Sequence, residues 1–301
     1  MAERVIVTGI NGFVGKHLTR ELVDNGIEVV GVGREDDIHG DIAHIVKEYY
    51  QIDMTKEWPA VMGDAVIHLA GLATVGPSFD APQDYLNLNS AMLTHMAEYY
   101  LSKEHKPRII VISSGAIYDP HQPMPITEES QIGYTSPYAV SKVLNEAQCK
   151  YYRSRGLECV VVRPFNHIGP GQLPGFLIPD VIEQLSRGDK ITVGNITTKR
   201  DYTDVRDIAR AYRLLATTSK LHFDIYNACS GRSIQGEKIV ELIKTAYDKP
   251  HANVLIDKSK MRPTDPIDIY GDYSRLNEDT GWMPEIPLEQ TILDIAGTNI
   301  K

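Results

Sequence analysis

Three glycines spaced three residues apart follow an apolar run, Val5–Val7, and open a helical pattern, Gly15–Asn25. Glycine lacks a Cβ, so it permits a tight turn, lets backbone N–H groups approach a pyrophosphate and lets the helix pack closely on the strand. A simple tight turn would show the same spacing, but its place between a strand and a helix predicts a dinucleotide-binding loop. The predicted loop residues are Gly9, Asn11, Gly12, Phe13, Val14 and Gly15.

The first half of the chain alternates short β-rich runs with helical stretches. The predicted strands are Val5–Val7, Glu28–Val32, Ala65–Leu69, Arg108–Ile112 and Cys159–Val162. The predicted helices include Gly15–Asn25, Asn89–Leu101 and Pro137–Arg155. This alternation predicts an α/β fold with a parallel, doubly wound sheet of the Rossmann type, which we assign to a dinucleotide-binding domain over residues 1–162.

The pattern loosens after Arg163, where glycine and proline cluster near 169–175 and again near 262–266. We therefore predict that residues 163–301 form mainly a smaller C-terminal substrate-binding lobe. One further strand–helix passage, near Val205–Leu215 and Asp224–Ala228, is expected to return to the main sheet, so that about 204–230 belongs to it.

Composition excludes several classes of function. The net charge of −9 has no basic stripe to offset it, which argues against a nucleic-acid partner. The three cysteines are scattered without ligand spacing, so we expect neither disulfides nor a metal site. No apolar run is long enough to span a bilayer, and the first residues show no charged-then-apolar leader. We expect a cytoplasmic protein with no membrane partner.

The end of the second predicted strand bears on the choice of cofactor. Where NAD-binding folds of this type place an acid for the adenosine ribose, this chain has Gly33 followed by Arg34. Glycine leaves room for a 2′-phosphate, and a guanidinium can bind a phosphate bidentately. Arg34 therefore favours NADP(H). The alternative is a solvated Arg34, with Glu35 or Asp36 reaching the ribose instead.

Further cofactor contacts are predicted at the ends of later strands. Asp53 and Met54 would hold the adenine, and the small residues of Leu69-Ala70-Gly71 would let the backbone lie beside the phosphates. His68 has apolar neighbours, so a structural role is expected for it rather than catalysis. Asn89 opens a predicted helix; it is either an N-cap or a brace for the loop under the nicotinamide.

Three side chains form the predicted catalytic group. Tyr138 and Lys142 lie one turn apart on a helix that begins after Pro137, and Ser114 follows the strand Arg108–Ile112 at the carboxyl edge where ligands bind in such sheets. A free phenol titrates near ~10, too high for acid–base work at neutral pH. We expect the neighbouring lysine and an oxidised nicotinamide to lower the Tyr138 pKa.

Together these motifs resemble the extended short-chain dehydrogenase/reductase family over nearly the whole chain. The glycine loop, His68–Gly71, Asn89, Ser113–Tyr118, Tyr138 with Lys142, and Arg163–Asn166 fall in the order and spacing of that family. The resemblance implies that Tyr138 is the acid–base, that Lys142 orients the nicotinamide ribose and that Ser114 polarises the substrate carbonyl.

The C-terminal half resembles the GDP-4-keto-6-deoxy-mannose reductases and, more distantly, the GDP-mannose 4,6-dehydratases. The similar segments are Arg163–Gln172, Val193–Asn195, Arg200–Asp207 and Arg262–Pro284. The resemblance implies that Asn166, Arg200 and Arg262 hold a nucleotide diphosphate, which needs more than one charge-assisted donor. Alternatively, Arg200 would pair with Asp201 or Asp204, and Arg262 would be a surface residue.

One position departs from the pattern of its relatives. Sugar-nucleotide dehydratases carry an acid two residues before the tyrosine that ends the serine segment, and this chain has Ala116 there. Without that carboxyl, dehydration is not expected. The reductases often carry Glu at this place too, which weakens the likeness to them, but reduction of a carbonyl does not need the group.

The predicted activity is therefore NADPH-dependent reduction of the C4 keto group of a nucleotide-linked 4-keto-6-deoxy sugar, with GDP-4-keto-6-deoxy-D-mannose as the favoured substrate. The alternatives are an NAD-dependent nucleotide-sugar 4-epimerase, against which Gly33-Arg34 argues, and a non-catalytic dinucleotide sensor. The helices Asn89–Leu101 and Pro137–Arg155 would pair across a two-fold axis, as is common in the family, so we expect a homodimer.

Overall fold

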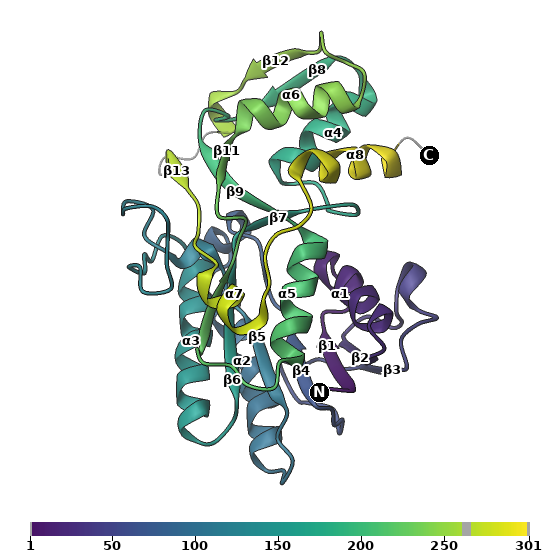
Figure 1. Cartoon of the computed structure of the whole chain (residues 1–301), viewed down its shortest axis with the longest axis vertical. Helices are drawn as coiled ribbons and strands as arrows, with labels where there is room; N and C mark the ends of the chain where they lie inside the picture. Colours follow the sequence, from purple (N-terminus) through teal and green to yellow (C-terminus); the bar gives the residue numbers. More distant parts are fainter. Residues whose placement is uncertain (1, 261–265, 300–301) are drawn as a thin grey trace.

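The computed structural model describes residues 2–260 and 266–299 (Figure 1). Its main body is built around a seven-stranded sheet. Its strand order is β10-β6-β5-β4-β1-β2-β3, and every neighbouring pair is parallel. The order confirms the predicted doubly wound α/β fold. The strands are β1 (Arg4–Thr8), β2 (Glu28–Gly33), β3 (Glu48–Gln51), β4 (Ala65–His68), β5 (Arg108–Ile112), β6 (Cys159–Pro164) and β10 (Ile225–Ala228).

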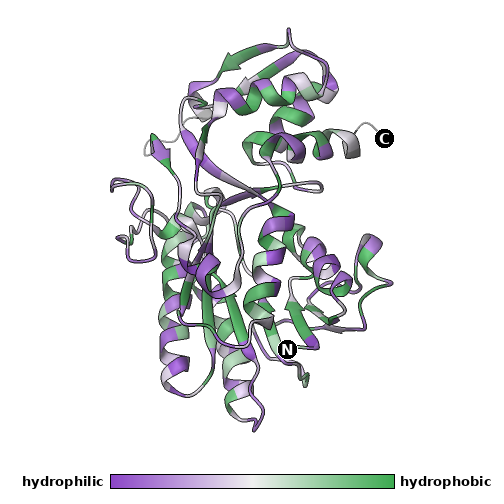
Figure 2. Ribbon diagram, viewed as in Figure 1, coloured by the Kyte–Doolittle hydropathy of each residue, from purple (hydrophilic) through white to green (hydrophobic). Residues whose placement is uncertain are grey.

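Helices cover both faces of this sheet because its strands are apolar on both sides (Figure 2). Alternate residues point to opposite faces: Val5 and Val7 pack with one helix pair, and Ile6 packs with the other. The first pair is α1 (Phe13–Asp24) and α5 (Val205–Thr217); the second is α2 (Pro82–Leu101) and α3 (Pro137–Ser154). The short 3₁₀ helices are η1 (Gly40–Ile42), η2 (Gly76–Phe79), η3 (Gly115–Ile117) and η4 (Lys258–Lys260).

A smaller lobe lies beyond the carboxyl ends of the main strands (Figure 1). Strand β9 pairs with β7, β11 and β13, and β8 pairs with β12. The helices of the lobe enclose a separate apolar core. Its elements are β7 (Asn166–Ile168), α4 (Leu177–Arg187), β8 (Lys190–Val193), β9 (Lys199–Asp204), β11 (Ser233–Gln235), α6 (Gly236–Ala246), β12 (Asn253–Ile256), β13 (Asp268–Ile269) and α8 (Leu288–Asn299).

The chain returns to the main body twice. α5 packs against α1, and β10 extends the sheet beside β6, in the passage that the sequence pattern indicated near 204–230. A second return was not predicted: α7 (Ser274–Thr280) contacts β10, and Trp282 is fully buried in the core on the α1–α5 face. The Trp282 indole Nε1 donates to the Asp207 carbonyl oxygen at 2.8 Å.

None of the helices in residues 2–260 and 266–299 combines the length and the apolar character that a membrane span requires. Within the same ranges, no three His, Cys, Asp or Glu side chains gather in a way that would hold a metal ion.

Candidate active site

The glycine loop between β1 and α1 is built as its sequence predicts. Gly9 has a φ of +66°, and a Cβ there would lie 3.0 Å from the Ala70 nitrogen of the neighbouring strand end. A Cβ on Gly15 would lie 2.5 Å from the carbonyl oxygens of Gly9 and Ile10. Gly12 is the N-cap of α1 and supplies no side-chain cap, so N–H groups of the first turn stay available to an anion.

Asn11 uses its side chain to hold the segment that follows β2. Its Nδ2 donates to the Asp37 carbonyl oxygen at 3.0 Å, and its Oδ1 accepts from the His39 amide at 2.8 Å. Phe13, the first residue of α1, stacks on His167 of β7, with the rings 6.2 Å apart and nearly parallel. The loop is therefore fixed against both the β2 end and the smaller lobe.

The end of β2 carries Arg34 and Glu35, the residues named as alternatives for the ribose contact. Arg34 is exposed, and within the described ranges its side chain makes no hydrogen bond or ion pair. Gly33 is crowded: a Cβ there would lie 2.7 Å from the Tyr49 hydroxyl and 2.9 Å from a Glu35 carboxylate oxygen. Glu35 thus folds back toward Gly33, which keeps the alternative of a ribose contact by Glu35 open.

The two residues predicted to hold the adenine differ in exposure. Asp53 lies at the surface, where its carboxylate accepts from the Thr55 amide and hydroxyl and pairs with Lys56 at 3.2 Å. Met54 is only 6% exposed and packs in the core on the α2–α3 face. The Met54 side chain therefore packs inside the protein, where little of it is accessible to a ligand.

His68 forms a buried link at the end of β4. Its Nδ1 lies 2.9 Å from the Thr8 hydroxyl oxygen, which also accepts from the Ala70 amide at 3.0 Å. Burial lowers the His68 pKa to about 3, so the ring is neutral. This arrangement fits the structural role expected for His68: it ties the end of β1 to the Leu69-Ala70-Gly71 segment.

Asn89 lies inside α2, which begins seven residues earlier at Pro82, so the N-cap interpretation was wrong. Pro82 at the first helical position is the signal that would have placed the start. The Asn89 Oδ1 accepts from the Leu72 amide at 2.8 Å, and its Nδ2 donates to the Ser141 hydroxyl at 3.0 Å. Its amide therefore braces the loop after Gly71 against the helix that carries Tyr138.

Ser114, Tyr138 and Lys142 come together at the carboxyl edge of the sheet. Ser114 caps η3, and its Oγ accepts from the Ala116 amide at 3.1 Å. Tyr138 is buried against Ser114 on one side and the Tyr85 ring on the other. Lys142 donates to the Ile112 carbonyl oxygen at 2.8 Å, and its Nζ lies 5.8 Å from the centroid of the Tyr138 ring.

The surroundings of Tyr138 within the protein shift its pKa upward. Burial raises the Tyr138 pKa, which outweighs the opposing effect of the Ser114 hydrogen bond. Burial also lowers the Lys142 pKa to about 8. The helical spacing of Tyr138 and Lys142 carries no information about this desolvation, and the lowering expected with an oxidised nicotinamide stays a prediction. At neutral pH these shifts keep the Tyr138 phenol protonated and leave most of the Lys142 side chain charged.

Comparisons with known proteins place this geometry in a family. A family model described as the NAD dependent epimerase/dehydratase family matches residues 5–229. The chain belongs to this family. The match confirms the resemblance to extended short-chain dehydrogenases/reductases, and the chain is an enzyme of the NAD(P)-dependent epimerase/dehydratase family.

Relatives within the family carry out different reactions. GDP-6-deoxy-D-mannose reductase of Pseudomonas aeruginosa is 32% identical over 314 residues, which cover 97% of this chain and 95% of that protein. UDP-glucose 4-epimerase of Bacillus subtilis is 27% identical over 325 residues, covering 96% and 95%. The solved structure of RMD from Pseudomonas aeruginosa complexed with NADPH is 30% identical, with a TM-score of 0.84 and 98% of each chain covered.

The residues predicted to bind substrate lie on the smaller lobe of this epimerase/dehydratase family member. Asn166 is exposed on β7, paired in register with Tyr202 of β9. Arg200 of β9 donates to the Pro266 carbonyl oxygen at 2.7 Å, so it steadies the chain just after 261–265. Arg262 lies outside the described residues.

Asp201 and Asp204 were the two alternative ion-pair partners for Arg200, and the carboxylates of both contact other groups. Asp201 accepts from the Ser230 amide and hydroxyl, each at 2.7 Å. Asp204 caps α5 and pairs with Arg206 at 2.7 Å.

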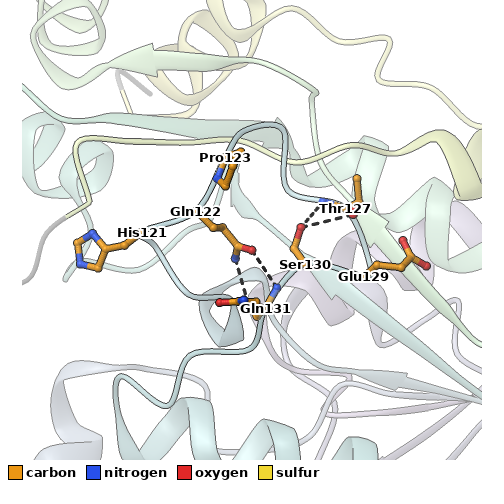
Figure 3. A pocket seen from close by; sticks show the side chains of 7 residues that line it. All are labelled: His121, Gln122, Pro123, Thr127, Glu129, Ser130 and Gln131. Atoms are coloured by element: carbon orange, nitrogen blue, oxygen red, sulfur yellow. Dashed lines mark hydrogen bonds between the residues drawn. The ribbon is translucent and has the colours of Figure 1, made fainter.

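Two surface depressions lie in the described part of the chain. One, of about 250 Å³, runs along β9 and is lined by Tyr202, Thr203, Asp204, Ser230, Arg232 and residues 284–288. The other, of about 480 Å³, is open and lies on the 121–131 loop, where Gln122 makes two hydrogen bonds with the Gln131 backbone (Figure 3). Neither includes Ser114, Tyr138 or Lys142.

Proposed function

We propose that the chain reduces the C4 keto group of a nucleotide-linked 4-keto-6-deoxy sugar with NADPH, and that GDP-4-keto-6-deoxy-D-mannose is its substrate. The observation that carries the proposal is the contact of Ser114 with a protonated Tyr138 at the carboxyl edge. A phenol that keeps its proton suits a group that must give one to a carbonyl oxygen. The 32% identity with a GDP-6-deoxy-D-mannose reductase supports the substrate class.

The residues at the phosphate loop fit a dinucleotide. Gly9 and Gly15 stand where any Cβ would meet backbone atoms, and the uncapped start of α1 offers N–H groups to a pyrophosphate. Arg34 is exposed and unengaged in the described part of the chain, so it can bind a 2′-phosphate. We propose NADP(H) on this basis. When bound, the cofactor supplies the hydride.

The side chains of the site supply orientation and the proton. The Ser114 oxygen accepts from the Ala116 amide, and its hydroxyl hydrogen, which faces Tyr138, can turn to the substrate carbonyl. Tyr138 donates its proton to the same carbonyl oxygen. Lys142, held by Ile112, presents its ammonium to the nicotinamide ribose and stabilises the phenolate left after proton transfer.

The chain's second candidate function is nucleotide-sugar 4-epimerisation with retained NAD. The 27% identity with a UDP-glucose 4-epimerase and the carboxylate of Glu35 beside Gly33 favour it. Dehydration is not proposed, because Ala116 places no carboxyl in η3. We also infer a homodimer through α2 and α3, since Leu144 and Tyr151 expose apolar surface two turns apart on α3.

Consumption of NADPH against a panel of GDP-, UDP- and dTDP-linked 4-keto-6-deoxy sugars tests the proposal, with the product configuration at C4 determined by NMR. We expect turnover with a GDP-linked ketosugar and at least about 100-fold slower turnover from a folded Tyr138→Phe control. Interconversion of UDP-hexoses without net cofactor consumption, and with no ketosugar reduced, would establish the epimerase instead.

A further inference from the structure

Glu146 lies one turn after Lys142 on α3. Its side chain is 11% exposed, and Arg163, which pairs with it, is 5% exposed. The pair is bidentate: Arg163 Nε donates to Oε1 at 2.9 Å and Nη2 donates to Oε2 at 2.7 Å. Removing a carboxylate from water costs free energy, which an ion pair only partly recovers. A stabilising effect alone therefore does not account for this buried charge beside Lys142.

A third contact joins Glu146 to the strand end that carries Ser114. The Ser113 hydroxyl donates to Glu146 Oε1 at 2.5 Å, while the Ser113 amide donates to the Val162 carbonyl oxygen at 2.7 Å. Ser113 is thus held from two sides. The backbone at Ser114, its neighbour, is therefore fixed relative to α3, the helix that carries Tyr138.

The charge of Glu146 also acts on Lys142. The groups that face Lys142 come from three elements: Tyr138 and Glu146 on α3, neutral His68 on β4, and the Ile112 carbonyl of β5. Burial lowers the Lys142 pKa, and Glu146 opposes that change. Among the titratable groups of the described chain that act on this lysine, Glu146 alone supplies a negative charge.

We propose that Glu146 is a positioning residue of the active site: it supplies the counter-charge for the buried Lys142 ammonium and holds Ser113, and through it Ser114, at the end of β5. The inference rests on the roles proposed above for Lys142 and Ser114. Arg163 holds Glu146 in place. The Arg163 Nη1 atom donates to the Tyr118 hydroxyl at 2.8 Å and to the Glu128 carbonyl oxygen at 3.0 Å.

The test measures NADPH affinity by fluorescence titration from about pH 7 to about pH 10, a range that spans the Lys142 transition. Affinity of the wild type should fall at alkaline pH as Lys142 loses its proton. Glu146→Gln keeps the volume and an oxygen for Ser113 but removes the charge. We expect the midpoint of its fall to move down by about one pH unit. Binding needs no sugar, so failure of the proposed reductase activity would leave this result intact.

Two matched variants separate charge from geometry. Glu128→Gln neutralises another buried carboxylate of the same polar network, one that accepts from the Asn227 amide and is not among the charges that act on Lys142, so its midpoint should stay at the wild-type value. Ser113→Ala keeps the charge of Glu146 and removes the hydroxyl contact. It should keep the midpoint and lower kcat by about tenfold, with KM for NADPH unchanged.

If Glu146→Gln does not fold, the double variant Glu146→Leu/Arg163→Met takes its place in the test, because it replaces the buried ion pair with apolar side chains. Its midpoint should also move down. A folded variant of either kind with the wild-type midpoint would overturn the proposal. So would a wild type whose NADPH affinity does not fall at alkaline pH, or a midpoint that moves equally in Glu128→Gln.

Discussion

The Lys142 ammonium donates to the Ile112 carbonyl oxygen at 2.8 Å and lies 5.8 Å from the centroid of the Tyr138 ring. The lysine is therefore held by strand β5 and not by the phenol. Loss of the phenol oxygen should leave Lys142, the fold and the cofactor site in place. The chemical role of Tyr138 can thus be measured separately from its packing.

Tyr138→Phe is expected to lower turnover by about 10²–10⁴-fold, the usual effect of removing a positioned acid–base group. Ser114→Ala should lower it by about 10²–10³-fold, because one donor to the developing oxyanion is lost. The two losses should not add, since both groups serve one oxygen. Steady-state kinetics of the single and double variants measure this, with circular dichroism and NADPH binding as controls. Wild-type turnover in a folded Phe variant would rule out Tyr138 as the donor.

Arg34→Ala tests the choice of cofactor without disturbing the crowded Gly33. A side chain at Gly33 would press on the Tyr49 hydroxyl and Glu35, whereas Arg34 is exposed. The variant should bind NADPH roughly 10- to 100-fold more weakly, as expected for a lost charge-assisted contact, and NADH about as before. Comparison of kcat/KM for both cofactors is the measurement. A wild type that prefers NADH, or an unchanged ratio in the variant, would contradict the proposal of NADP(H).

Arg200→Ala should weaken binding of GDP roughly 10- to 100-fold and leave NADPH binding nearly unchanged. Arg200→Lys, which keeps the charge but loses the planar fork, should fall between the two. Calorimetric titration with each ligand measures both effects, and Arg262→Ala is expected to behave like Arg200→Ala. Because Arg200 also holds the Pro266 carbonyl, melting temperatures are needed. Equal losses for both ligands with a lower melting temperature would mark Arg200 as structural.

Gly15→Ala should destabilise the protein by about 1–3 kcal/mol and abolish tight NADPH binding. The added Cβ would lie 2.5 Å from two backbone oxygens, so the loop and the start of α1 must separate. Gly188→Ala is the matched control: nothing lies within 4 Å of a Cβ there, and its φ of 169° is extended backbone. It should change stability by less than about 0.5 kcal/mol. Urea denaturation and NADPH titration measure both variants; equal behaviour would contradict the steric argument.

Stability and cofactor affinity should respond to alkaline pH in opposite directions. The Lys142 pKa is lowered from 10.5 to about 8, so between these values the unfolded chain binds a proton that the folded protein does not. The contribution of Lys142 to stability therefore rises from about pH 8 to about pH 10.5, by about 3 kcal/mol. Urea denaturation of wild type and Lys142→Met across this range isolates that contribution. A constant difference between the two proteins would show that burial does not shift Lys142.

Local motifs made the central site predictable from sequence. The glycine loop depends on backbone geometry within seven residues, and Tyr138 and Lys142 depend on one helical turn. Asn89 was misplaced because its helix was started seven residues late, although Pro82 marks the true beginning. The upward effect of burial on the Tyr138 pKa could not be predicted for a different reason: the groups that bury the phenol, such as Tyr85, come from distant segments.

Long-range contacts account for what the sequence pattern did not reveal. Glu146 and Arg163 were visible as residues, but only the packing of α3 against the ends of β5 and β6 brings their charges together. The same holds for Trp282, which closes the core of the main body from a position near the end of the chain. Periodicity identifies elements and their apolar faces; it does not identify which remote segment completes a core.

The burial of Trp282 has a consequence for attempts to recombine this enzyme with its relatives. A gene cut after β10 would not encode a self-sufficient cofactor-binding module, because it would leave out the indole that fills the core beside α5 and bonds to Asp207. Loss of such a side chain costs about 3–5 kcal/mol, a large part of the stability of an ordinary domain. The smaller lobe therefore cannot be exchanged as one contiguous segment. A chimaera must keep α5, β10 and the segment from α7 to Trp282 from the same parent as the sheet, and take only the intervening pieces from another.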